Sequence, residues 1–153
     1  MSILRWNDLP EITRNTRNAS HFKRIITERF GAAKPPTYYF LGTKLGNIFH
    51  SRFRMGLTQL NADIFKYNPL HSPACSCGYP KEDVKHFVLE CPNFAQHRIA
   101  LLDLITTHDI LRNLAMKQVI NILIFGNITN KSLENSIATS FQNFLVQTKR
   151  FSF

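Results

Sequence analysis

The chain has 153 residues, of which 44% are hydrophobic, and it carries a formal net charge of +9. This hydrophobic fraction suffices for a packed core and excludes wholesale disorder. The richest apolar run, residues 119–125, is far shorter than a membrane span, so the sequence predicts one compact domain, or one domain with an arm, and no membrane partner.

The positive charge is concentrated in the first part of the chain. Residues 1–60 contain ten Lys and Arg against three Asp and Glu, a net +7, whereas residues 61–153 contain nine against seven, a net +2. This asymmetry favours a polyanionic partner, because neutralised phosphates release counterions and supply affinity that does not depend on sequence. The alternative is that the charge serves only solubility.

The first predicted element is a helix over residues 20–31, in which apolar residues recur at helical spacing. Lys23 and Arg24 lie on the flank of this helix and are candidates for contact with nucleic acid. Residues 32–39 contain Pro35 followed by a second proline, which a helix interior does not tolerate. We therefore expect an extended connector there.

A second helix is predicted over residues 43–60, where apolar residues step by three or four. Lys44 lies opposite this apolar stripe on a helical wheel, and Arg52 and Arg54 lie on its two shoulders. A helix with one packed face and a basic rim suits phosphate contacts, although any surface helix also needs a charged outer face. Residues 61–73 are predicted to form a loop or short strand.

All three cysteines of the chain follow, in the pattern C-x-C-x8-H-x4-C formed by Cys75, Cys77, His86 and Cys91. Three thiolates and one imidazole make a Cys3His set, which holds structural Zn²⁺ in closed tetrahedral sites. Cys75 and Cys77 face the same way in an extended segment. Pro92 favours an extended conformation at Cys91, which takes this residue out of the preceding helix and lets it turn toward the ion.

Three alternatives to this zinc site stay open. The cysteines can be buried free thiols, two of them can form a disulfide, or His71 can replace His86 as the nitrogen ligand. An odd number of cysteines and no signal peptide argue against an oxidising compartment. We therefore expect an intracellular protein, nuclear or cytoplasmic.

Three further helices are predicted after the cysteines, over residues 95–106, 110–125 and 132–150. The predicted fold class is mainly α, with a zinc-stapled Cys3His hairpin between an N-terminal and a C-terminal helix group. Residues 1–40 would form a basic N-terminal helix with its proline connector, and residues 41–153 the zinc-binding helical domain.

No segment carries a catalytic pattern. The sequence has no glycine-rich phosphate loop, no HExxH and no pair of aspartates spaced for a two-metal centre. His86 could nominally serve a cysteine nucleophile as its base, but the three-thiol cluster accounts for it better. The sequence therefore predicts that the chain is not an enzyme.

A succession of short segments resembles the carboxyl-terminal region of reverse transcriptases from non-LTR retrotransposons of the jockey-like kind. The segments, which span nearly the whole chain, are Trp6–Pro10, Ser20–Lys23, Pro35–Tyr39, His50–Leu57 with Leu60-Asn61, Cys75–Gly78, His86-Phe87, Cys91–Phe94, Leu123–Asn127 and Thr148–Phe151. Single segments are weak signals, but their order together with the cysteine pattern is specific. Met1 directly precedes the tryptophan segment, so the resemblance implies a truncated copy or a piece of such a polyprotein.

The resemblance implies Zn²⁺ bound by Cys75, Cys77, His86 and Cys91, and a role in holding RNA or target DNA. The aspartates of the parent polymerase are absent, so its activity is not implied. Two functions are therefore expected as alternatives. One is a zinc-stabilised nucleic-acid-binding tail, and the other is a structural module that docks on the polymerase body of the parent polyprotein.

Overall fold

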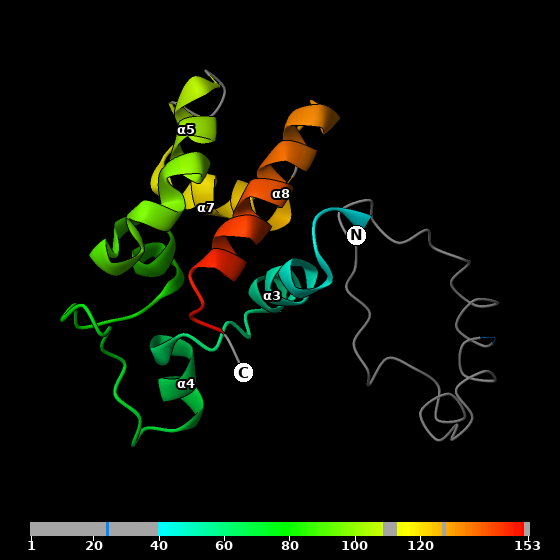
Figure 1. Cartoon of the computed structure of the whole chain (residues 1–153). Helices are drawn as coiled ribbons and strands as arrows, with labels where there is room; N and C mark the ends of the chain where they lie inside the picture. Colours follow the sequence, from blue (N-terminus) through cyan, green and yellow to red (C-terminus); the bar gives the residue numbers. More distant parts are fainter. Residues whose placement is uncertain (1–23, 25–39, 109–112, 127, 152–153) are drawn as a thin grey trace. The chain divides into compact units, whose positions relative to one another are not determined.

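The computed structural model describes residues 24, 40–108, 113–126 and 128–151 (Figure 1). The chain divides into two units, Met1–Pro36 and Thr37–Phe153, and all described residues except Arg24 belong to the second unit. The predicted N-terminal helix, apart from Arg24, and the proline connector lie outside the described residues. The helices of the second unit are α3 (Lys44–Met55), α4 (Asn61–Tyr67), η3 (His86–Glu90), η4 (Pro92–Phe94), η5 (Gln96–Arg98), α5 (Ile99–Thr107), α7 (Met116–Phe125) and α8 (Lys131–Gln147).

The predicted mainly helical fold class is confirmed, because the described part of the chain contains helices and turns but no strand. The cysteine segment lies between the helix group of α3 and α4 and the group of α5, α7 and α8. None of the described helices is long and apolar enough to cross a membrane.

Helix α3 begins and ends at clear local signals. The Thr43 side chain accepts a hydrogen bond from the Gly46 amide (3.0 Å) and so caps the first turn. Gly56 has a left-handed backbone with φ of 69°, which ends the helix because its amide turns back to the carbonyls of Arg52 and Phe53. The helix is therefore shorter than the predicted span of residues 43–60.

The prediction of a loop or strand over residues 61–73 is wrong for residues 61–67, which form helix α4, and is confirmed for residues 68–73, which form turns and loop. The reason lies 21 residues further along the chain. The Glu82 side chain accepts a hydrogen bond from the Asn61 amide (2.9 Å), and the Glu82 carbonyl accepts one from the Ala62 amide (3.2 Å). This long-range capping satisfies two amides at the helix start, so α4 depends on tertiary contacts.

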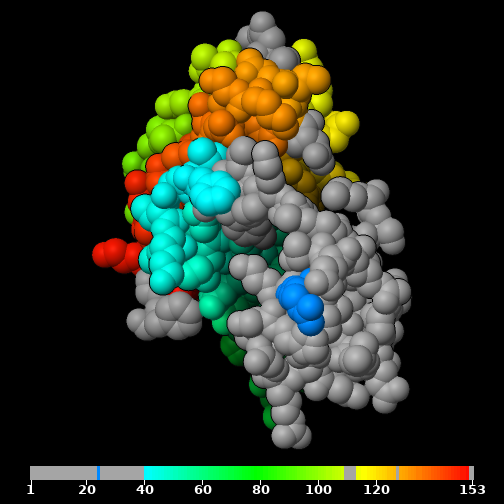
Figure 2. Space-filling view, turned by 90° about the vertical axis from the view of Figure 1, so that its right-hand side faces the viewer, coloured from blue at the N-terminus to red at the C-terminus, as the bar shows by residue number. Residues whose placement is uncertain are grey.

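Helix α8 is the centre of the second unit and contacts α3, α5 and α7 (Figure 1). The space-filling view shows the start of α3, in cyan, directly below the first half of α8, in orange (Figure 2). At this crossing a Cβ atom on Gly46 would lie only 2.9 Å from the Cβ of Gln142. A glycine at position 46 thus permits the close packing of the two helices.

The core beneath α8 is built largely from phenylalanines. Phe53 of α3 packs edge-on against Phe141 of α8, with ring centroids 5.6 Å apart, and lies 6.1 Å from Phe87 of η3. Phe87 in turn lies 5.3 Å from Phe144 and 5.4 Å from Phe151. All five rings are buried. Because Phe87 follows His86 directly, the core fixes the position of the predicted metal ligand.

His50, which the helical wheel places on a shoulder of α3 beside Arg54, is fully buried between α3 and α7. Its Nε2 donates to the Ile124 carbonyl (2.9 Å), and Nε of Arg54 donates to the same oxygen (2.7 Å). Burial, and secondly the positive charge of Arg54, lower the pKa of His50 from 6.5 to about 4.

This burial predicts a loss of stability in acid. The unfolded chain binds a proton at His50 near pH 6.5, but the folded chain binds it only near pH 4, so the free energy of unfolding falls as the pH drops through that window. We expect a loss of about 2 to 3 kcal/mol between pH 7 and pH 4. Urea denaturation of the wild type and of His50→Gln at both pH values measures the difference, and an equal acid loss in the two proteins would contradict the prediction.

Candidate metal centre

A tight turn presents the first two cysteines. The Cys75 amide donates to the Tyr79 carbonyl (2.8 Å), and the Gly78 amide donates to the Cys75 carbonyl (3.0 Å). Gly78 has φ of +93°, a conformation that L side chains rarely adopt, and this glycine lets the chain reverse after Cys77. The Glu82 amide closes the hairpin by donating to the Pro73 carbonyl (2.8 Å). This turn brings Cys75 and Cys77 to one side.

The other two residues of the pattern flank an unusual helix. At the start of η3, which is a π-helix, the Asp83 carboxylate accepts a hydrogen bond from the His86 amide (3.0 Å). The Cys91 amide donates to the His86 carbonyl (2.7 Å), five residues back. Cys91 itself is extended, with φ of −61° and ψ of 121°, as expected for a residue before proline. The wide turn brings Cys91 round to the side of His86.

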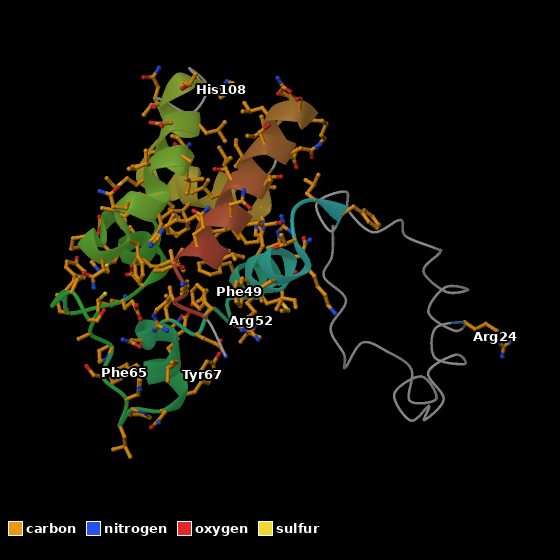
Figure 3. The ribbon with its side chains drawn as sticks, viewed as in Figure 1. Arg24, Phe49, Arg52, Phe65, Tyr67 and His108 are labelled. Carbon is orange, nitrogen blue, oxygen red and sulfur yellow. The ribbon has the colours of Figure 1, made fainter. Side chains whose placement is uncertain are left out.

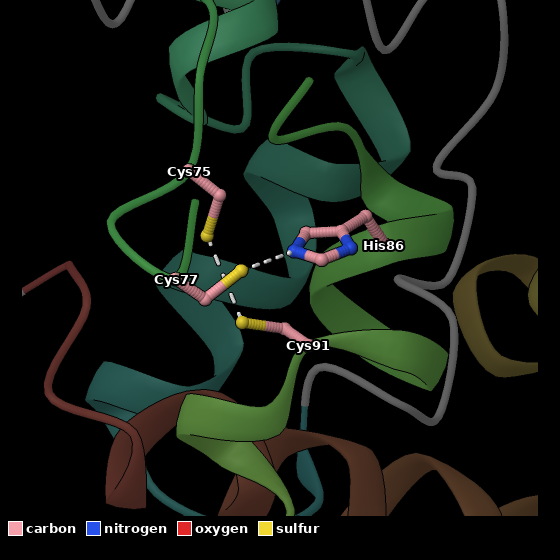
Figure 4. A group of neighbouring side chains, drawn as sticks. All are labelled: Cys75, Cys77, His86 and Cys91. Carbon is pink, nitrogen blue, oxygen red and sulfur yellow. Dashed lines mark hydrogen bonds between the residues drawn. The ribbon is translucent and has the colours of Figure 1, made fainter. Parts of the chain in front are cut away.

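The four side chains of the predicted set converge on one point (Figure 4). Their ligand atoms, three sulfurs and one imidazole nitrogen, all lie within 4.8 Å of one another. The sulfurs of Cys75 and Cys91 are 3.6 Å apart, and the Cys77 sulfur is 3.2 Å from Nε2 of His86. A tetrahedral ion with bonds of about 2.3 Å holds its sulfur ligands about 3.8 Å apart, so these separations suit a metal ion.

The same distances bear on the alternatives to a metal site. All three cysteines are free, and 3.6 Å between Cys75 and Cys91 is far beyond a bonded pair of sulfurs. Nε2 of His71 lies 3.1 Å from the Asn61 side-chain oxygen and takes no part in the cluster. The cluster therefore contains His86, and the cysteines are arranged as thiols around a common centre.

Most of the cluster is buried, and an aromatic ring packs against its histidine. Cys75, Cys91 and His86 are buried, and burial raises the pKa of the Cys91 thiol to about 12. A thiol with this pKa stays protonated at neutral pH unless a cation lies beside it. The ring of His86 stacks on Tyr79, with centroids 4.3 Å apart and planes 5° apart. This stacking holds the imidazole with Nε2 toward the sulfurs.

A buried ion pair, which sequence reasoning missed, connects the cluster to the end of α8. Glu82 is 2% exposed and accepts two hydrogen bonds from Arg150, at 2.9 Å from Nε and 2.6 Å from Nη2. The same carboxylate lies 4.0 Å from the Cys75 sulfur. These hydrogen bonds raise the pKa of Arg150 above its ordinary value. The paired arginine allows the Glu82 carboxylate to be buried beside the Cys75 sulfur.

A further arginine, Arg98, is buried at the other side of the cluster. Nη2 of Arg98 donates to the Cys91 carbonyl (2.6 Å) and to the Phe87 carbonyl (3.2 Å). A divalent ion with three thiolates and one neutral imidazole carries a net charge of −1, and Glu82 adds another negative charge. Arg98 and Arg150 balance these two charges, so the surroundings suit a Cys3His metal centre electrostatically.

The structure separates the predicted nucleic-acid-binding residues. Lys44 and Arg52 line the same hollow on the outer side of α3, whereas Arg54 reaches the carbonyl of Ile124 on α7. The Arg52 guanidinium also donates to the Gln59 side chain (2.9 Å). Arg24 is exposed in the first unit, and Lys23 lies outside the described residues.

Comparison of the chain with family models, with curated proteins and with solved structures finds no match.

Proposed function

We propose that this chain is a zinc-stabilised nucleic-acid-binding module, corresponding to the C-terminal region of a non-LTR retrotransposon reverse transcriptase and lacking a polymerase centre of its own. The observation that carries the proposal is the convergence of Cys75, Cys77, His86 and Cys91 within 4.8 Å. The order of the sequence segments supports the relationship to reverse transcriptases. Binding of RNA or target DNA follows from the basic side of α3.

Zinc is the ion that suits this donor set. Thiolates are soft ligands, and a mixed set of three thiolates and one imidazole in a tetrahedron is typical of Zn²⁺. The four protein ligands leave no position for water or substrate, so the ion has a structural role. It would join the turn at Cys75 and Cys77 to η3 at His86, and thereby hold Phe87 in the core.

The nucleic-acid interface proposed here is the outer side of α3. Lys44 is exposed and Arg52 is half-buried, and both lie in one hollow. The sequence of α3, KLGNIFHSRFRM, contains no acidic residue. A helix of uniform positive sign attracts phosphates over a distance of about one Debye length, roughly 8 to 10 Å.

Docking on a protein is the second candidate function, and α5 favours it. Ile99 and Leu102 are 49% and 37% exposed, three residues apart on one side of the helix. An apolar helix side of this kind can pack on another protein, such as the polymerase body of a parent polyprotein. A nucleic-acid-binding module should bind RNA and DNA with a steep dependence on salt, whereas a docking module should not.

The test replaces Lys44 and Arg52 together by glutamine in the zinc-loaded chain. Each lost phosphate contact removes nearly one released counterion, so the slope of log K against log salt is expected to become shallower by roughly one to two units. Affinity for RNA and DNA should fall about equally across sequences. Fluorescence anisotropy at several salt concentrations measures both quantities.

The matched control replaces Lys117 and Lys131 by glutamine. Both lysines are exposed, on α7 and α8, so this variant loses the same two charges without touching α3. We expect its salt slope to change by less than that of the α3 variant. Identical slopes in the two variants would reject the α3 interface, and no binding in any variant would favour the docking module.

A further inference from the structure

Two neighbouring hollows lie along the outer side of α3, and the second extends to α4. Its first hollow has a volume of about 590 Å³ and is lined by Phe40, Lys44, Ile48, Ser51, Arg52 and Met55, among others. A second hollow of about 390 Å³ is lined by residues of α3 and α4, including Tyr67, the last residue of α4. Arg52 and Met55 line both hollows, so the two hollows adjoin, and together we call them the α3 groove.

Each end of the α3 groove carries an exposed aromatic ring. Phe40 is 74% exposed and Tyr67 is 77% exposed, although large aromatic side chains are usually well buried. Met55, at the junction of the two hollows, is 63% exposed. Figure 3 shows Arg52 on α3 and Tyr67 below it on α4. Exposed rings at the two ends of one groove provide flat surfaces for ligands that stack.

The cations of the groove are spaced along α3. Lys44 and Arg52 are eight residues apart, which corresponds to roughly 12 Å along the helix axis. They can therefore contact different phosphates of one strand. Asp63 is the one carboxylate among the described lining residues, and Lys66 and the Thr58 hydroxyl both bind it. Its charge is thereby offset, and the groove has a net positive charge.

We infer that the α3 groove binds single-stranded nucleic acid, with bases stacked on Phe40 and Tyr67 and phosphates at Lys44 and Arg52. This inference rests on the proposed function and specifies its ligand. Base stacking on aromatic side chains is available only where bases are unpaired, because the bases of a duplex already stack on one another. A partly apolar groove with cations between two exposed rings has the composition of a single-strand site.

The test measures binding of the zinc-loaded full chain to three labelled ligands: a 12-nucleotide uridine RNA, the matching thymidine DNA and a 12-base-pair duplex DNA. We expect tighter binding to both single strands than to the duplex. Phe40→Ala and Tyr67→Ala should each weaken single-strand binding roughly fivefold or more and leave duplex binding unchanged. Phe40→Trp should restore the affinity, because tryptophan also stacks.

Phe65→Ala is the matched control, since Phe65 is a 41% exposed aromatic residue on the opposite side of α4 from Tyr67 (Figure 3). It should bind all three ligands like the wild type. Zinc content and helicity of each variant show that it is folded. Loss of affinity in the lysine and arginine variant but in neither aromatic variant would overturn the inference and leave the proposed function standing. No binding to any nucleic acid would overturn both, with a protein as the remaining occupant.

Discussion

Removal of zinc is expected to unfold the segment from Pro73 to Arg98 and to loosen the whole helical unit. Metal binding contributes folding free energy on the order of 10 kcal/mol in small zinc domains. A domain of this size has a net stability of only about 5 to 15 kcal/mol, so little is left without the ion. We expect about one Zn²⁺ per purified chain, and a large loss of helicity and of the thermal transition when a chelator removes it.

Cys77→Ser should have a similar effect without a chelator, because a hydroxyl does not replace a thiolate ligand. Zinc content by elemental analysis and helicity by circular dichroism are expected to fall together. His86→Ala should also release zinc, whereas His71→Ala should retain it, since His71 lies against Asn61 outside the cluster. Equal stability with and without chelator would reject the structural role of the ion, and zinc loss in His71→Ala alone would reassign the fourth ligand.

Loss of the ion pair between Glu82 and Arg150 is expected to lower both the stability of the fold and the affinity for zinc. Arg150→Gln leaves the Glu82 carboxylate buried without its cation, 4.0 Å from the Cys75 sulfur. Loss of one partner of a buried pair costs about 3 to 5 kcal/mol, and we expect about 3 kcal/mol because the Arg150 side chain is 26% exposed. Zinc affinity should fall about tenfold, since the unpaired carboxylate opposes the negative charge of the metal centre.

Two further variants isolate the buried pair. Glu82→Gln combined with Arg150→Gln removes both charges and should recover part of the lost stability and affinity. Lys131→Gln breaks an exposed pair with Glu134 that has the same 2.6 Å separation, and it should cost less than about 1 kcal/mol. Urea denaturation and competition with a zinc-binding dye measure the two quantities. If Arg150→Gln behaves like Lys131→Gln, the ion pair has no role at the metal centre.

The four residues of the cluster are predictable from the sequence because their information is local. The turn depends on two cysteines one residue apart and on the glycine that follows them. The end of η3 depends on the proline after the third cysteine. The partners of the cluster are not predictable in this way. Arg150 lies 68 residues beyond Glu82, and no local pattern connects the two.

The helices show the same division between local and long-range information. The Thr43 cap begins α3 where the sequence predicts it, whereas Gly56 ends the helix before residue 60, the predicted end. Residues 61–67 are too few for a stable isolated helix. Helix α4 therefore cannot be predicted without knowing that Glu82 caps its first residue, Asn61. His50 has a polar side chain at the edge of an apolar stripe, and only the carbonyl of Ile124 explains its burial.

The two parts of the candidate metal centre close chain segments of very different length. The ligands from Cys75 to Cys91 close a loop of 16 residues, whereas the Glu82–Arg150 pair bridges 68. Short loops close at a lower entropic cost, so the ligand loop can capture its ion while α8 is still being synthesised. Arg150, which follows α8, can then bind Glu82 and so connect the ligand loop to the last helix. With the proposed zinc bound, the centre would form before the later helices pack against it.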